Sequence, residues 1–307
     1  MVNEYLKPKT LDEALAALAV PGSVALAGGT WLLVGEEHGT RPELGRVVDI
    51  GELVPSDIGR KGTTARVGAG ATFQALADSP ALPACLRKSA LSMANRNTRN
   101  RATLGGNLGA DKSCASLVPI LLALDATLEY AVRGADGKAA TKTAPLAAWL
   151  ERKDGLALAV SFEAPAGLLA ASGRASRTAC DVATATVGAA YRLEGGAVKD
   201  LRIAMGGFGP RARRMPKLEA LFEGKALPDK AGIEKLAEPL LDAISDQRGS
   251  AAYKKRRGAV ILADALAGAC RIANALAAAV ILGGLLGDSG AVAAVLPGAR
   301  RDIASVQ

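Results

Sequence analysis

Two segments built around adjacent glycines constrain this chain more than any other feature. Ala27-Gly28-Gly29-Thr30 ends a short apolar run, and Thr103-Leu104-Gly105-Gly106-Asn107 follows a polar, basic stretch. Glycine adopts positive φ and lets a ligand approach the backbone closely, and successive exposed N–H groups bind anions. Thr30, Thr103 and Asn107 add side-chain donors. The two turns therefore predict a site for the two phosphates of a dinucleotide, to which Arg99 or Arg101 can add charge.

Two ordinary tight turns are the alternative, because glycine makes up 35 of the 307 residues. Neither turn is followed by the Gly-Lys-Ser/Thr of a P-loop, and neither has the spacing of the Rossmann fingerprint. The phosphate hypothesis therefore makes two demands on the structure. The turns must meet in space, and their N–H groups must be free of protein acceptors.

Histidine and cysteine usage limits the chemistry. The only histidine, His38, lies in a polar stretch, which argues against serine–histidine triads and multi-histidine metal sites. We therefore expect no catalytic side chain and no metal site, and a cofactor that supplies the chemistry. The cysteines are too far apart for a metal or iron–sulfur site. We expect four reduced thiols in a cytoplasmic protein, with a disulfide pair as the alternative: Cys85, Cys114, Cys180 and Cys270.

The net charge is +8, carried in local clusters such as 254–257 that are not interleaved with aromatic residues. Because single-strand binding uses such interleaving, we expect solvated faces or partner docking rather than a nucleic-acid site. The N-terminus lacks the charged-then-apolar run of a signal peptide. The apolar run 275–287 falls short of the roughly 20 residues that span a bilayer, so we predict a buried or interface segment there.

Hydrophobic periodicity predicts alternating short helices and strands in the first half of the chain. Thr10-Leu11-Asp12-Glu13 is a capping box for the first helix, and the last strand of this half covers 155–162. The Gly-, Ala- and Ser-rich segment 165–176 predicts the domain boundary. Strands within 183–191 and 198–205, followed by helices, predict an α+β second domain. The expected units are 1–168, 177–276 and an apolar tail of unknown role, 277–307.

The glycine turns also carry a family resemblance. Together with Val118-Pro119-Ile120-Leu121-Leu122-Ala123-Leu124-Asp125-Ala126, their order and spacing resemble the FAD-binding subunit of molybdenum hydroxylases of the xanthine dehydrogenase and carbon monoxide dehydrogenase type. Two later segments are similar to second-domain signatures of that family: Leu201-Arg202-Ile203-Ala204-Met205-Gly206-Gly207 and Asp246-Gln247-Arg248-Gly249-Ser250-Ala251-Ala252-Tyr253-Lys254. The resemblance covers residues 3–276.

The resemblance implies an α+β fold. A vanillyl-alcohol-oxidase-type FAD-binding domain, made of two small α/β subdomains, would be followed by a domain of antiparallel sheet plus helices. It also implies two partners, a molybdopterin-binding large subunit and a small subunit with [2Fe–2S] clusters. Electrons would pass from the clusters to FAD and on to NAD or another acceptor.

The resemblance assigns roles to particular residues. The family's two double-glycine turns hold the FAD diphosphate. That role passes to Gly28, Gly29, Thr30, Thr103, Gly105, Gly106 and Asn107, with backbone contacts from Ala27 and Leu104. Asp181 matches an acidic position near the isoalloxazine, with a cap or a surface charge as the alternative.

The chain departs from the family after the second turn. The family commonly has Ser/Asp-Pro there, and three residues later an Asp that bonds the sugar region of the flavin. Here Ser113 and Ser116 take the Pro and Asp positions. Ser116 can still form a hydrogen bond, or Asp111 can substitute for it from one turn earlier. Trp31 also stands where Asp is common. These departures put FAD affinity, and service to a standard purine dehydrogenase, in question.

Two other functions remain open at this point. One is a stand-alone flavin oxidase or reductase, against which the 3% aromatic content and the single histidine argue. The other is a non-enzymatic scaffold subunit with a decayed flavin site. The substrate of the complex is open among purines, aldehydes, carbon monoxide, nicotinate and aromatic CoA esters, with a purine or related N-heterocycle favoured by frequency in the family. The cysteine spacing gives no support for the extra four-cysteine cluster of the benzoyl-CoA type.

Overall fold

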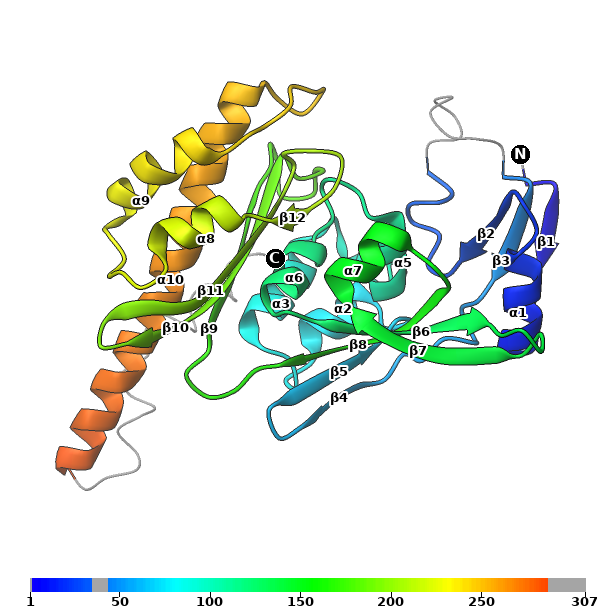
Figure 1. The fold of residues 1–307 in the computed structure, drawn as a ribbon, viewed down its shortest axis with the longest axis horizontal. Helices are drawn as coiled ribbons and strands as arrows, with labels where there is room; N and C mark the ends of the chain where they lie inside the picture. Colours follow the sequence, from blue (N-terminus) through cyan, green and yellow to red (C-terminus); the bar gives the residue numbers. More distant parts are fainter. Residues whose placement is uncertain (1, 35–43, 287–307) are drawn as a thin grey trace.

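The structure is a computed structural model that describes residues 2–34 and 44–286, and beyond residue 269 it describes the helical path alone. His38 and residues 287–307 of the expected tail lie outside the described residues. Three sheets follow one another along the long axis of the molecule (Figure 1). The first two belong to the N-terminal half of the chain, and the third belongs to the C-terminal half.

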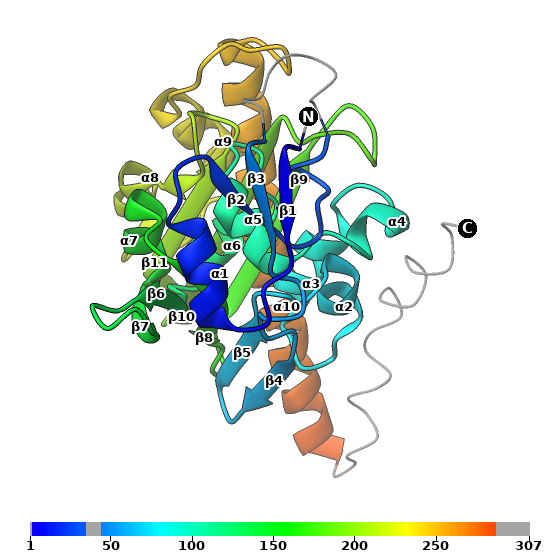
Figure 2. The same cartoon turned by 90° about the vertical axis from the view of Figure 1, so that its right-hand side faces the viewer.

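The first sheet is parallel, and β3 lies between β1 and β2. Its elements are β1 (Glu4–Leu6), α1 (Leu11–Leu18), β2 (Ser23–Leu26) and β3 (Arg46–Asp49). Figure 2 faces this unit, with α1 lying against the strands. The Thr10 hydroxyl caps α1 by accepting a hydrogen bond from the N–H of Glu13 at 3.2 Å, as predicted. The Glu13 carboxylate accepts from the N–H of Lys9 instead of returning to Thr10.

The second sheet is antiparallel, in the order β4-β5-β8-β6-β7. Its strands are β4 (Ile58–Lys61), β5 (Thr64–Gly68), β6 (Thr127–Arg133), β7 (Ala139–Pro145) and β8 (Leu156–Glu163). The helices that cover it are α2 (Phe73–Asp78), α3 (Ala84–Leu91), α4 (Arg96–Arg99), α5 (Leu104–Ala110), α6 (Val118–Ala123) and α7 (Leu146–Arg152). Every residue of α6 is buried, so this helix is the centre of the largest core cluster.

The third sheet, β12-β11-β10-β9, is antiparallel and lies between helices of both halves of the chain (Figure 1). Helices α3 and α6 pack against one face, and α8 and α10 pack against the other. Its strands are β9 (Leu169–Ala175), β10 (Ala185–Glu194), β11 (Ala197–Gly206) and β12 (Arg213–Arg214). Its helices are α8 (Pro216–Phe222), α9 (Lys230–Ala237), the 3₁₀ turn η2 (Glu238–Leu240) and α10 (Ala251–Leu286).

The segment predicted as a domain boundary contains β9, so the third sheet begins at residue 169 rather than after 176. Its small residues have a packing reason. A Cβ on Gly173 would lie 2.9 Å from Val187 Cγ1 and 3.2 Å from the carbonyl oxygen of Ile261 in α10. Because small residues also mark loops, the composition of 165–176 could not separate close packing from a linker.

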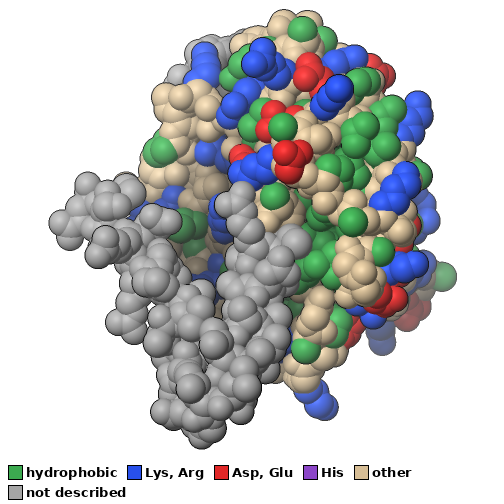
Figure 3. Space-filling model, turned by 90° about the vertical axis from the view of Figure 1, so that its left-hand side faces the viewer, with side chains coloured by type: hydrophobic (Ala, Val, Ile, Leu, Met, Phe, Trp, Pro, Cys, Tyr) green, Lys and Arg blue, Asp and Glu red, His purple; other side chains and the backbone are tan. Residues whose placement is uncertain are grey.

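The charged side chains form no single-sign surface on the face shown in Figure 3. Lys and Arg lie there among acidic and apolar side chains, in keeping with the solvated faces predicted from the sequence. Within residues 2–34 and 44–286, no helix has both the length and the hydropathy that crossing a membrane requires.

Candidate functional site

The first glycine turn leaves the carboxyl end of β2 and exposes its backbone. The N–H of Ile50 binds the carbonyl oxygen of Leu26 at 2.9 Å, which fixes the end of the strand. Gly29 then adopts φ +74°, a conformation that favours glycine. Across the described part of the chain, the N–H groups of Gly28, Gly29 and Thr30 bind no protein acceptor. This turn therefore offers successive free donors, as the sequence predicted.

The second glycine turn is the start of helix α5, and its N–H groups are already bound. Thr103 is the N-cap, and its hydroxyl accepts from the N–H of Gly106 at 3.1 Å. The carbonyl oxygen of the same residue accepts from Asn107 at 3.0 Å. The N–H groups of Leu104 and Gly105 bind the carbonyl oxygens of Ala71 and Ala69, at 2.9 and 2.7 Å. The N–H groups of residues 104–107 are therefore not free, contrary to what the sequence led us to expect, and the role of this turn in holding the diphosphate stays a prediction.

The physical reason lies in the packing of α5. A Cβ on Gly105 would lie 2.9 Å from the Cβ of Ala69, so this glycine allows the helix to approach the segment that follows β5. Leu104 is 2% exposed and belongs to the core rather than to the site, which corrects its predicted backbone role. A pair of glycines looks the same in the sequence whether it admits a ligand or a neighbouring chain segment.

The two turns nevertheless meet, as the hypothesis required. A Cβ on Gly28 would lie 1.8 Å from the carbonyl oxygen of Arg101, two residues before the second turn. Both turns line one cavity of about 710 Å³. Leu104 does not line this cavity, but every other predicted site residue does: Ala27, Gly28, Gly29, Thr30, Thr103, Gly105, Gly106, Asn107, Ser116 and Asp181.

One flank of α5 runs along this cavity. Thr103, Gly106, Asn107 and Ala110 line it with the i, i+3, i+4, i+7 spacing of a single helix face. A Cβ on Gly106 would meet only the Thr103 hydroxyl oxygen, at 3.0 Å. The Asn107 side-chain oxygen accepts from the N–H of Leu117 at 3.2 Å, and this bond ties α5 to the start of α6. The flank thus presents small side chains and one hydroxyl, rather than backbone donors, to a bound molecule.

Asp111 does not replace the missing family aspartate. Its carboxylate is 1% exposed and lies 3.1 Å from Lys153 Nζ and 3.4 Å from Arg211 Nε. Neither cation is aligned for a hydrogen bond, so these are close ionic contacts between the second sheet's helices and the loop before β12. Ser116, in contrast, lines the cavity and is the polar group available at that position.

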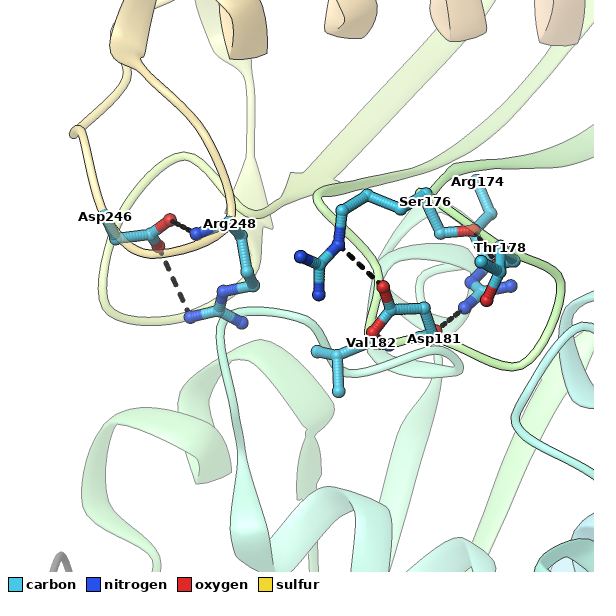
Figure 4. A network of polar contacts seen from close by, with 8 residues as sticks. Arg174, Ser176, Thr178, Asp181, Val182, Asp246 and Arg248 are labelled. Carbon is cyan, nitrogen blue, oxygen red and sulfur yellow. Dashed lines mark hydrogen bonds and ion pairs between the residues drawn. The ribbon is translucent and has the colours of Figure 1, made fainter.

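The loop between β9 and β10 forms another part of the cavity wall. Figure 4 shows Asp181 on this loop, beside Arg174 and across from the Asp246–Arg248 pair. The Asp181 carboxylate accepts from Arg177 Nε and from the N–H of Val182, both at 2.8 Å. These two bonds lower the pKa of Asp181, so it carries its negative charge at neutral pH. The Arg174 guanidinium donates to the carbonyl oxygens of Ala179 and Asp181 and holds the loop in place.

Cationic side chains in the cavity wall escaped the sequence reasoning. Lys112, Lys153 and Arg174 line the cavity, whereas Arg99 and Arg101 do not. Arg99 is committed to Gln74 and to two carbonyl oxygens of the α3–α4 connection. Only Lys112 had a sequence signal, because it lies inside the segment that departs from the family. The other two depend on contacts between distant parts of the chain.

Three of the four thiols belong to side chains that the structure describes. Cys85, Cys114 and Cys180 are free, as predicted for them, and Cys270 lies where side chains are not described. Burial raises the pKa of Cys85 to about 12, so it stays protonated. Among the described residues, no three His, Cys, Asp or Glu side chains gather in a way that could hold a metal ion.

The arrangement fits an elongated dinucleotide such as FAD. The cavity volume lies within the range of about 300–1,000 Å³ typical of cofactor sites, which are mostly apolar with a few polar groups. Apolar residues of β2 and β8 and residues of the β9–β10 loop line the cavity together with the first turn. The free N–H groups of that turn are donors that a diphosphate can use.

Comparison with known proteins identifies the family. Residues 1–159 match the FAD binding domain in molybdopterin dehydrogenase, and residues 171–269 match the CO dehydrogenase flavoprotein C-terminal domain. The chain belongs to the FAD-binding subunits of the molybdopterin dehydrogenases. Its fold is therefore the α+β FAD-binding fold of these subunits, and FAD is the family's cofactor, as the resemblance implied.

Relatives of this FAD-binding subunit cover nearly all of its described length. The xanthine dehydrogenase FAD-binding subunit of Escherichia coli O157:H7 is 30% identical over 82% of this chain and 90% of its own. The carbon monoxide dehydrogenase medium chain of Afipia carboxidovorans is 28% identical over 86% of this chain and 95% of its own. A solved carbon monoxide dehydrogenase from Hydrogenophaga pseudoflava matches with a TM-score of 0.76 and 27% identity, over 87% of this chain and 97% of that one.

Proposed function

We propose that this chain binds FAD in the cavity between the two glycine turns and carries electrons within a molybdenum hydroxylase complex. Electrons would arrive from the [2Fe–2S] clusters of a small subunit, after substrate oxidation in a molybdopterin-binding large subunit. They would leave to NAD or another acceptor. The observation that carries the proposal is the meeting of the two turns at one cavity, with the free N–H groups of the first turn in its wall.

The chain's own residues would bind and orient the cofactor. The N–H groups of Gly28, Gly29 and Thr30 would donate to the diphosphate, and Thr103 and Ser116 would offer hydroxyls. The ring would lie toward the β9–β10 loop, where Asp181 and Arg174 place fixed charges. When bound, the flavin supplies the redox chemistry itself, taking electrons singly and passing them on in pairs.

The division of the chain follows from this arrangement. We propose 1–168 as the FAD-binding domain and 177–276 as the body of the C-terminal domain, with β9 contributing to its sheet from residue 169. A cytoplasmic location and xanthine dehydrogenase-like specificity belong to the same proposal. The similarity to the E. coli xanthine dehydrogenase subunit supports this specificity. The similarity to the carbon monoxide dehydrogenase medium chain is of the same order, so the substrate of the complex must be tested.

A scaffold subunit with a decayed flavin site is the second candidate. Two observations favour it: the N–H groups of residues 104–107 in the second turn are taken by protein acceptors, and Ser116 stands in place of the family aspartate. A chain that cannot hold FAD would still pack its third sheet against α3 and α6. The two candidates therefore differ in flavin content rather than in fold.

The test combines cofactor content and partners. The full chain is purified, and its flavin is measured by absorption and by release on denaturation. A tagged chain is also isolated with its native partners, and iron, molybdenum and flavin are determined. Stoichiometric FAD together with iron- and molybdenum-bearing subunits supports the electron-transfer role. A colourless chain that still brings down both partners would establish the scaffold, and a yellow chain alone would favour a stand-alone oxidase or reductase.

A further inference from the structure

Three positive side chains line the described wall of the cavity, and two of them are already engaged. Lys153 lies 3.1 Å from the buried Asp111 carboxylate. Arg174 donates to the carbonyl oxygens of Ala179 and Asp181. Lys112 has neither kind of partner: within residues 2–34 and 44–286, no carboxylate lies within 4 Å of its ammonium group and no acceptor takes a hydrogen bond from it.

Lys112 lines the same cavity as the two glycine turns. It follows Asp111, the αL residue that caps the C-terminus of α5, the helix that begins at the second turn. Its Nζ lies 4.7 Å from the centre of the Trp31 ring, and Trp31 directly follows the first turn. A cation–π contact at an exposed position is weak, about 0.5–1 kcal/mol. The indole therefore orients the ammonium group of Lys112, and the three N–H donors of that ammonium group remain available to a ligand.

The cavity needs a positive charge at this place. A diphosphate linkage carries two negative charges, and the first turn meets them with neutral N–H groups alone. Residues 104–107 of the second turn add no backbone donors, because their N–H groups are bound to Thr103, Ala69 and Ala71. Desolvating an anion without a nearby cation is costly. The free cation of the described wall is thus the group that the geometry leaves for this charge.

We infer that Lys112 binds the diphosphate of the cofactor and that Trp31 positions it for this contact. This inference rests on the proposed function, and it adds a binding residue that lies outside both glycine turns. It also explains how the site holds a dianionic group although the N–H groups of residues 104–107 are bound within the protein. The charge would be supplied by one lysine of the cavity wall, just after the end of α5.

The experiment measures binding of ADP and of riboflavin to the full 307-residue chain by titration calorimetry. ADP carries the diphosphate without the ring, and riboflavin carries the ring without a phosphate. Because a hydrogen bond to a charged group contributes about 1.5–3 kcal/mol, Lys112→Gln should weaken ADP binding about tenfold or more. Riboflavin binding should stay unchanged. Lys112→Arg should keep most of the ADP affinity, and Trp31→Leu should lose less than Lys112→Gln does.

Lys142→Gln is the matched control, because Lys142 is an exposed residue of β7 that does not line the cavity. Circular dichroism confirms that each variant is folded. Equal ADP affinity of Lys112→Gln and the wild-type chain overturns the inference, as does an equal loss for ADP and riboflavin. A wild-type chain that binds riboflavin but not ADP overturns it too, while leaving a flavin site in place. If the chain binds none of FAD, ADP and riboflavin, the proposed function itself is overturned.

Discussion

The first glycine turn, at residues 27–30, leaves the N–H groups of Gly28, Gly29 and Thr30 without protein acceptors in the described part of the chain. In the second turn, at 103–107, the N–H groups of residues 104–107 are all bound to protein acceptors. Both turns consist of a glycine pair beside small polar residues, and both line the same cavity. The first turn follows a strand and opens toward a ligand. The second begins a helix that must pack against Ala69.

The difference shows that a glycine pair has two physical uses, which the local sequence does not separate. One use is access for a ligand, and the other is close approach of two protein segments. In this chain the two uses are joined, because the first turn itself packs against the carbonyl oxygen of Arg101. The ligand-facing turn is therefore held in place by the segment that leads into the structural one.

The largest effect is expected where the two turns touch. In Gly28→Ala, the new Cβ would lie 1.8 Å from the carbonyl oxygen of Arg101 and 2.6 Å from its carbon. Both are backbone atoms, so the turns must separate. We expect a loss of about 1–3 kcal/mol in the free energy of unfolding and no retained FAD, measured by urea denaturation and flavin absorption. Gly59→Ala is the control, since nothing lies within 4 Å of its Cβ position. A yellow, stable Gly28→Ala chain would show that the turns do not depend on each other.

Sequence patterns predicted the family and the fold class, because these depend on local features. The glycine turns, Ser116 and Asp181 line one cavity as expected, and Thr10 caps α1. The patterns failed where a residue's role depends on a distant neighbour. The N–H groups of Leu104 and Gly105 are bound by the carbonyl oxygens of Ala71 and Ala69. The small residues of β9 are explained by close packing against α10. The contact between Lys112 and Trp31 joins segments that are far apart in the chain.

The second prediction separates the two glycines of the second turn. Gly106→Val should fill the cavity beside the Thr103 hydroxyl, so FAD is lost while the unfolding transition changes little and the second domain stays folded. Gly105→Ala should instead lower stability by about 1 kcal/mol or more, because its Cβ would press against the Ala69 Cβ at 2.9 Å. Flavin occupancy and thermal melting are measured on both variants. Full FAD occupancy in Gly106→Val would remove this turn from the site.

The third prediction concerns the cap that occupies the second turn's donors. Thr103→Val removes the hydroxyl that accepts from the N–H of Gly106 at 3.1 Å. Loss of an N-cap costs about 1 kcal/mol, so the melting temperature should fall by a few degrees, whereas Thr103→Ser should restore it. If the valine variant melts like the wild-type chain, the N–H groups of this turn are less firmly bound than the structure indicates. They would then be available to phosphate after all.

The smallest effect is expected from pH, because neither turn contains a titrating side chain. Hydrogen bonds from Arg177 and Val182 lower the pKa of Asp181 from its ordinary 3.8. The negative charge of Asp181 is therefore fully present at neutral pH, and its contribution to flavin retention is lost only as the pH falls through that lowered pKa. Burial lowers the pKa of Arg174 from its ordinary value, and the charge of Asp181 opposes this shift. Arg174 thus loses its charge only on the alkaline side.

Flavin retention after gel filtration should accordingly be flat between about pH 5 and 8, the range in which unperturbed histidine is the side chain that titrates. A step near pH 6.5 would contradict a site made of neutral N–H groups and permanently charged side chains. It would implicate His38, the chain's one histidine, which follows the first turn and lies outside the described residues. His38→Gln would then decide the matter, because a step that survives this substitution requires a shifted group in the cavity wall itself.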